Sequence, residues 1–146
     1  MSFFEIGITH GKTEHNIGGL WRAAYQLGAS GIYTIASRYP ARQPSDTYQA
    51  WKHIPRRDFD NLQDFLLARP YDAMLVGVEI SGKPLPEFVH PKRCIYLLGA
   101  EDHGLSPSEL NACNQVVSIP ALRQASYNVA VAGALVMYDR MTKGTK

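Results

Sequence analysis

The sequence predicts an α/β protein with a mostly parallel sheet and helices on both faces. Short, almost continuously apolar segments recur along the chain, and helical patterns separate most of them. Strands that read as unbroken apolar runs, without polar alternation, are typical of parallel sheets buried on both faces. The 146 residues suit one domain around one core, so we expect a single domain over residues 1–146.

Five segments have the composition of buried strands. Each contains β-branched or aromatic residues and is bounded by glycine, proline or polar residues. Gly99 ends the fourth segment and Pro120 ends the fifth. The expected strands are residues 3–8, 31–35, 73–78, 94–98 and 116–119.

Helical spacing of apolar residues predicts the intervening elements. Asn16 is the expected N-cap of the first helix, and Gly28 its end. Ser106 and Glu109 form a capping box for a short helix, which has Pro107 at its first position. The expected helices are residues 16–27, residues 58–67, a short helix from residue 106, and residues 126–141.

The final expected helix has an unusual composition. Ser126 is its expected N-cap, and the helix is apolar nearly all round until Asp139. A helix of this kind is buried on more than one side. In so short a chain, this indicates a subunit interface.

Composition narrows the function classes. No apolar run approaches the roughly 20 residues that a membrane helix needs, and the N-terminus lacks the basic region of a signal peptide. The two cysteines indicate neither a disulfide framework nor a metal site, so we expect a cytoplasmic protein without a metal.

The net charge of +2 is small, but residues 38–57 are rich in basic and aromatic side chains. Such side chains neutralise phosphates and stack on bases, which favours RNA binding, although a solvated loop would have the same composition. The basic residues are Arg38, Arg42, Lys52, Arg56 and Arg57.

Three stretches combine glycines with polar residues. In the first, Gly18 and Gly19 share a helix face with Arg22, which leaves space for a ligand or phosphate beside the guanidinium. The second, residues 97–105, is an acidic loop at a strand end that contains Glu101 and His103.

The third stretch, residues 119–128, places Ser126 and Asn128 where a helix begins. Ser126 can be explained as an N-cap alone. Asn128 is harder to explain, because Asp139 is the next strongly polar residue, and polar groups at a helix N-terminus are well placed to meet a ligand.

Taken in order, these stretches resemble the three motifs of the SpoU-TrmH branch of the SPOUT RNA methyltransferases. They read Asn-x-Gly-x-x-x-Arg from Asn16, Leu-x-Gly-x-Glu-x-x-Gly-Leu from Leu97, and Ile-Pro followed by Ser-x-Asn-Val-x-Val-Ala from Ile119. The resemblance covers essentially the whole chain and corresponds to the minimal, TrmL-like size. Two departures are a five-residue spacing between Pro120 and Ser126, where six is common, and Tyr127 in place of leucine or methionine.

The resemblance implies a deep C-terminal trefoil knot, an exception to ordinary topology. It further implies a homodimer through the first and last helices, S-adenosylmethionine as cofactor, and an RNA ribose 2′-hydroxyl as acceptor, with tRNA the expected RNA. The implied cofactor-binding residues are Val78, Leu98, Gly99, Ile119, Ala121, Ser126 and Asn128. Arg123 is an unexpected charge near this site and a further candidate RNA contact.

By its position, Arg22 is the catalytic arginine that the resemblance implies. It acts either as a phosphate clamp or as a base with assistance, because a free guanidinium has a pKa above about 12. Asn16 and Glu101 are expected to organise Arg22, and Ser126 and Asn128 to shape the pocket. Two alternatives remain: a catalytically silent knotted RNA-binding or assembly protein, and a small α/β enzyme on another ligand with Glu101 and His103 as acid and base.

Overall fold

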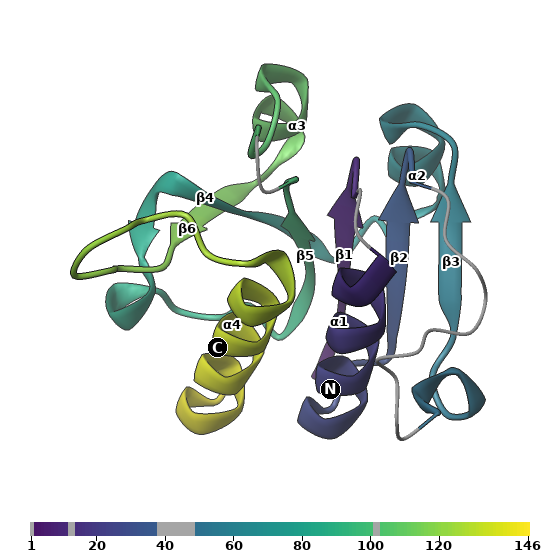
Figure 1. The fold of residues 1–146 in the computed structure, drawn as a ribbon, viewed down its shortest axis with the longest axis horizontal. Helices are drawn as coiled ribbons and strands as arrows, with labels where there is room; N and C mark the ends of the chain where they lie inside the picture. Colours follow the sequence, from purple (N-terminus) through teal and green to yellow (C-terminus); the bar gives the residue numbers. More distant parts are fainter. Residues whose placement is uncertain (1, 12–13, 38–48, 101–102) are drawn as a thin grey trace.

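A six-stranded sheet forms the centre of the molecule. The computed structural model describes residues 2–11, 14–37, 49–100 and 103–146. The paired strands are all parallel and lie in the order β3-β2-β1-β5-β4-β6 (Figure 1). The predicted α/β class with a parallel sheet is therefore confirmed. The strands are β1 (Phe3–Thr9), β2 (Gly31–Ile35), β3 (Arg56–Phe59), β4 (Met74–Pro84), β5 (Arg93–Leu98) and β6 (Gln115–Ser118).

Helices pack on both faces of this sheet, as predicted. In β5, Tyr96 and Leu98 point into the core cluster that includes residues of α1 and α4. Ile95 and Leu97 point into the opposite cluster, which includes residues of α2 and α3. Figure 1 shows α1 and α4 side by side across one face. The helices are α1 (Glu14–Leu27), α2 (Leu62–Ala68), α3 (Pro107–Ala112) and α4 (Val129–Lys143), with short 3-10 turns η1 (Ala50–Lys52) and η2 (Leu85–Glu87).

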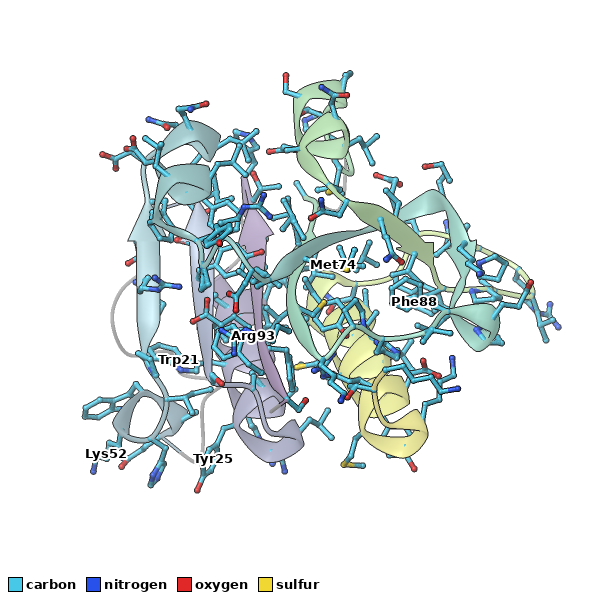
Figure 2. All side chains as sticks on the ribbon, turned by 180° about the vertical axis from the view of Figure 1, so that it is seen from behind. Trp21, Tyr25, Lys52, Met74, Phe88 and Arg93 are labelled. Atoms are coloured by element: carbon cyan, nitrogen blue, oxygen red, sulfur yellow. The ribbon has the colours of Figure 1, made fainter. Side chains whose placement is uncertain are left out.

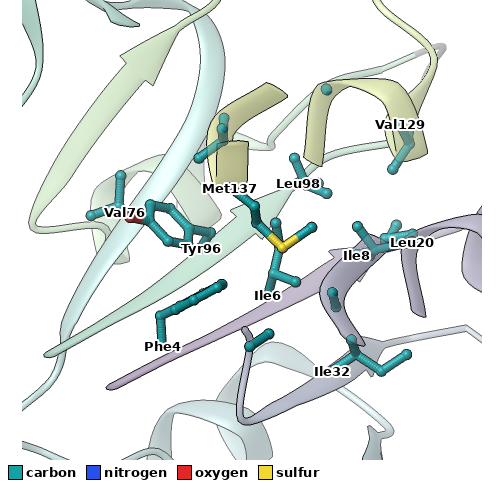
Figure 3. Packing of buried hydrophobic residues seen from close by; sticks show 14 of the residues in the cluster. Phe4, Ile6, Ile8, Leu20, Ile32, Val76, Tyr96, Leu98, Val129 and Met137 are labelled. Carbon is teal, nitrogen blue, oxygen red and sulfur yellow. The ribbon is translucent and has the colours of Figure 1, made fainter. Parts of the chain in front are cut away.

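The core beneath α1 and α4 is tightly packed. Met137 of α4 lies close to Ile6 of β1 (Figure 3), and both are fully buried. A Cβ at Gly133 would lie 2.5 Å from Cδ1 of Leu20 in α1, so glycine permits the close approach of these two helices. Each fully buried side chain of this size contributes about 1.5–3 kcal/mol.

Strand β3 and the start of α2 differ from the sequence prediction. Strand β3 was not predicted, because its four residues include three charges. One of these, Arg57, donates to Oε1 of Glu5 at 2.6 Å, a partner that only the fold reveals. Residues 58–59 therefore belong to a strand, and α2 begins after an N-cap at Asn61 rather than at Asp58.

Strand β4 is longer than predicted. It continues to Pro84 through a register shift between Val78 and Lys83, beyond the expected end at residue 78. The capping box of α3, by contrast, is confirmed, with Ser106 and Glu109 in the expected roles.

The predicted starts of the first and last helices were wrong. Helix α1 begins at Glu14, two residues before the expected cap. The N-cap of α4 is Asn128, whose side chain accepts from the Val131 N–H at 3.2 Å, and Ser126 precedes the helix. Helix α4 is not buried all round in a single copy of the chain, since it exposes Val131, Leu135, Tyr138 and Met141.

A buried polar cluster anchors the C-terminal half of α4. His90 is fully buried between the Tyr96 hydroxyl at 2.6 Å and Asp139 Oδ2 at 2.7 Å. Arg140 donates to the Pro91 carbonyl at 2.7 Å. Burial lowers the pKa of His90, and nearby Arg140 and Lys143 add to this effect, while Asp139 opposes it.

The described helices include none with the length and apolar character needed to cross a membrane. Both cysteines are free thiols. Burial raises the pKa of Cys94 to about 12 and that of Cys113 to about 11.

Candidate functional site

The candidate site lies at the carboxyl ends of three neighbouring strands. Leu98 of β5 pairs with Val78 of β4, and Val78 pairs with Val117 of β6. Open α/β sheets bind ligands at such an edge, where the segments that follow each strand converge. Three stretches far apart in sequence therefore meet: residues 78–80, residues 98–100 with 103–104, and residues 119–132.

A cavity of about 250 Å3 opens among these stretches. This volume is close to the lower end of the roughly 300–1,000 Å3 of small-molecule sites. Of the residues assigned to the cofactor from the sequence, Ala121 and Asn128 do not line the cavity. Those that line it are Val78, Leu98, Gly99, Ile119 and Ser126.

The loop after β5 has a shape that only glycine allows at two positions. A Cβ at Gly99 would lie 2.4 Å from the carbonyl carbon of Gly104. Gly104 has a φ of +64° and donates its N–H to the Ala100 carbonyl at 2.8 Å, which closes the loop on itself. The two glycines of the second motif are thus explained by backbone geometry. Glu101 lies outside the described residues.

The first and third motifs meet through two side-chain amides. Asn128 donates to Oδ1 of Asn16 at 2.9 Å, and Asn16 is buried. This bond joins α1 to the N-cap of α4. It gives Asn128 a physical role beyond that of an isolated polar residue at a helix start. Ser126 is exposed and lines the cavity, so capping does not explain it.

Arg22 lies half-buried on α1, the helix that packs beside α4. A Cβ at Gly19, on the same helix, would lie 3.4 Å from the Cβ of Ala130 in α4, which is an ordinary van der Waals distance. Packing therefore tolerates alanine at Gly19 and does not by itself explain the glycine, whereas the sequence pattern favours space for a ligand beside the guanidinium.

Sequence reasoning missed Glu79, which lines the cavity. Its Oε2 accepts the Leu105 N–H at 2.8 Å, and its Oε1 accepts the Ile80 N–H at 2.8 Å. An acidic residue directly after a buried apolar strand was the available signal, and the same signal singles out Glu101.

The basic residues assigned to RNA lie in different surroundings. Lys52 is exposed, and its Nζ lies 5.4 Å from the ring centroid of Trp51. The side chain of Arg56 is only 8% exposed and pairs with Asp58 at 3.1 Å. Arg57 makes the Glu5 ion pair described above. Arg38 and Arg42 fall outside the described residues.

Lys52 and the cavity lie at different ends of the sheet. Lys52 lies with Trp21 and Tyr25 at one corner (Figure 2), beside the amino end of β3. The cavity lies at the carboxyl ends of strands. Arg123 is exposed on the segment between β6 and α4.

No cluster of three metal-ligating side chains occurs among the residues that the structure describes. His103 is exposed at the rim of the cavity.

Known proteins are similar to this chain over most of its length. The model of the SpoU rRNA Methylase family matches residues 4–138. The 23S rRNA (guanosine-2'-O-)-methyltransferase RlmB of Acinetobacter baylyi is 27% identical over 135 residues, which are 86% of this chain and 54% of RlmB. The chain thus spans about half the length of this curated relative.

Solved structures share the fold along nearly the full chain. The SpoU methyltransferase AviRb from Streptomyces viridochromogenes, solved with AdoMet, has a TM-score of 0.85 at 23% identity, covering 99% of this chain and 60% of AviRb. A structure concerned with the 2-OH methylation of C/U34 on tRNA has a TM-score of 0.84 at 24% identity and covers 99% of this chain and 93% of that protein. Because the family model matches well over half of its residues, the chain belongs to the SpoU rRNA Methylase family.

Proposed function

We propose that this chain is a cytoplasmic, S-adenosylmethionine-dependent RNA ribose 2′-O-methyltransferase that acts on tRNA, with rRNA as the alternative substrate. The observation that carries the proposal is the cavity at the ends of β4, β5 and β6, in a chain matched by the SpoU family model over residues 4–138. The relative RlmB is a 23S rRNA 2'-O-methyltransferase. The size match to the protein concerned with tRNA position 34 favours tRNA.

The residues present fit S-adenosylmethionine. Apolar side chains of Val78, Leu98 and Ile119 line walls suited to an adenine ring and to the methylene groups of the cofactor. At Gly99 the backbone itself reaches the cavity, where main-chain groups can bond the ring edge. Ala121 and Asn128 lie on the segment between β6 and α4 that supplies part of the lining, and they are proposed as further cofactor contacts.

S-adenosylmethionine, held by Val78, Leu98, Gly99 and Ile119, would supply an electrophilic methyl group. The methyl–sulfur bond would break with its electron pair left on sulfur, the 2′-oxygen would gain the methyl group, and the hydroxyl proton would pass to water. Most of the catalysis is positioning. Arg22 binds the neighbouring RNA phosphate through its forked donors. Asn16 and Asn128 fix the relative position of α1 and α4, and Glu101 and Ser126 complete the proposed set.

RNA affinity is assigned to Arg22, Arg38, Arg42, Lys52, Arg56, Arg57 and Arg123. Lys52 and Arg123 are exposed, which supports their assignment to RNA binding most directly. Arg56 and Arg57 must exchange a carboxylate partner for a phosphate to take part. Affinity that depends on phosphate contacts falls steeply as salt rises.

We further propose a homodimer through α1 and α4. Val131, Leu135 and Tyr138 recur at helical spacing on α4 and are 38–57% exposed, which is unusual for an apolar stripe without a partner. Tyr25 of α1 is also exposed. The trefoil knot is supported by the chain path, since residues 119–128 return from edge strand β6 past the ends of β4 and β5 to reach α4.

The test is methyl transfer from labelled S-adenosylmethionine to tRNA and rRNA purified from cells that lack this protein, with nuclease mapping of the product. We expect 2′-O-methylation at one tRNA site. Arg22→Ala should reduce turnover roughly 100-fold while calorimetry shows cofactor affinity retained. Lys92→Ala, an exposed change at the amino end of β5, is the matched control.

Absence of S-adenosylmethionine binding in calorimetry, together with no transfer to any RNA, would favour the catalytically silent RNA-binding protein. Normal turnover by Arg22→Ala would remove Arg22 from the mechanism.

A further inference from the structure

Glu79 joins two walls of the cavity that are distant in sequence. The residue follows Val78, where β4 leaves its regular pairing with β6. Its two carboxylate oxygens are held separately, Oε1 by the Ile80 N–H and Oε2 by the Leu105 N–H, both at 2.8 Å. The carboxylate therefore ties the loop after β5 to the end of β4.

The loop is shaped to receive this carboxylate. A Cβ at Gly104 would lie 2.2 Å from Oε2 of Glu79, so the loop backbone comes as near to the oxygen as glycine allows. Leu105 is itself buried in the core on the α2 and α3 face. The loop is thus fixed by a buried side chain at one end and by the Glu79 hydrogen bond beside the cavity.

Glu79 also gives the cavity its charge. Among the described residues that line the cavity, it is the one acidic side chain, and no lysine or arginine joins it there. S-adenosylmethionine carries two positive charges, on its sulfonium and its ammonium group, and one negative charge, on its own carboxylate. The product, S-adenosylhomocysteine, has lost the sulfonium charge, so a fixed negative wall attracts the two compounds differently.

We propose that Glu79 is a positioning and specificity-determining residue: its carboxylate holds the loop after β5 through Leu105, and its charge favours the sulfonium cofactor over the uncharged thioether product. This inference rests on the proposed function. It assigns to Glu79 a part in product exchange, because the attraction weakens once the methyl group has left.

Two variants separate the two roles. Glu79→Gln removes the charge and keeps one acceptor oxygen, which can serve the Leu105 N–H while the Ile80 N–H loses its partner, whereas Glu79→Ala removes the charge and both acceptors. Glu87→Gln, on exposed η2, makes the same change in net charge away from the cavity and is the control. Thermal unfolding establishes that each variant is folded.

The positioning role is read in the cofactor-free protein by hydrogen exchange at the Leu105 amide. Glu79→Ala should speed this exchange roughly tenfold or more, because the amide loses its acceptor. Glu79→Gln should stay close to the unchanged protein. Unchanged exchange in Glu79→Ala overturns the positioning role.

The charge role is read by calorimetric titration with S-adenosylmethionine and S-adenosylhomocysteine. Glu79→Gln should weaken the cofactor roughly fivefold more than the product, and Glu87→Gln should leave the ratio unchanged. Equal effects on both compounds overturn the specificity role while the proposed function stands. If the unchanged protein binds neither compound, the proposed function and the specificity role both fail, and the exchange result alone decides the positioning role.

Discussion

The side-chain amide of Asn128 donates to Oδ1 of Asn16 at 2.9 Å, although 112 positions separate the two residues. Asn128 at the same time caps α4 through the Val131 N–H. One side chain thus starts the last helix and fixes it to the first. Because α1 carries Arg22 and the segment before α4 lines the cavity, this bond sets the proposed acceptor and cofactor groups relative to one another.

Asn128→Ala should lower the free energy of unfolding by about 1–2 kcal/mol, since it removes both a cap and an interhelical bond. Asn128→Ser restores the cap but is too short to reach Asn16, so it should recover about half of the loss. Urea unfolding measures the free energy of unfolding of both variants. If Asn128→Ser is as stable as the unchanged protein, the bond to Asn16 adds nothing to stability.

Gly99→Ala should disrupt the loop after β5, because its methyl group would meet backbone atoms of Gly104 and Leu105 that cannot move independently. We expect a loss of about 1–3 kcal/mol in unfolding free energy and weaker binding of S-adenosylmethionine in calorimetry. Gly19→Ala is the comparison, since its methyl group meets one Cβ at 3.4 Å and a helix favours alanine. Similar losses of unfolding free energy in both variants would contradict the close approach of the Gly104 and Leu105 backbone to Gly99.

Acid should destabilise the protein through His90. Its pKa is lowered from 6.5 in the folded state, chiefly by burial, so the unfolded chain binds the proton more readily. The stability is complete above pH 6.5 and falls as the pH drops from 6.5 through the lower folded pKa, by about 1.4 kcal/mol for each pH unit that separates the folded and unfolded pKa values. The unfolding free energy measured in urea should fall more steeply between pH 7.5 and pH 5.5 for the unchanged protein than for His90→Gln. Parallel profiles would show that His90 does not titrate this way.

Neither cysteine should react with iodoacetamide in the folded protein at pH 8. The pKa of Cys94 is raised to about 12 and that of Cys113 to about 11, both chiefly by burial, so the reactive thiolate is scarce. Mass spectrometry should detect both adducts after unfolding in urea. Labelling of native Cys113 at the unfolded rate would mean that its thiol is open to solvent.

The features that the sequence predicted correctly depend on local chemistry. The apolar run that forms β5 is buried from Cys94 to Leu98, and nothing outside the run is needed to identify it as a strand. The capping box between Ser106 and Glu109 spans a single turn, so it too can be read directly. In each case the partners are neighbours in the chain.

The features that were missed depend on distant partners. Strand β3 contains Arg56, Arg57 and Asp58, and its charges make sense only beside Thr34 and Glu5. Ser126 and Asn128 are equally good N-caps by local rules, and the structure uses Asn128, whose side chain also bonds the distant Asn16. Glu79 was overlooked because its partner at Leu105 is 26 residues away.

The sheet order has a consequence for synthesis on the ribosome. Strand β1 pairs with β5, and the side chains of β1 are covered by α4, which is made long after β1. Val136 and Met137 of α4 are both fully buried. The apolar face of β1 must therefore stay uncovered until α4 has been made, and contacts of such long sequence separation favour slow folding.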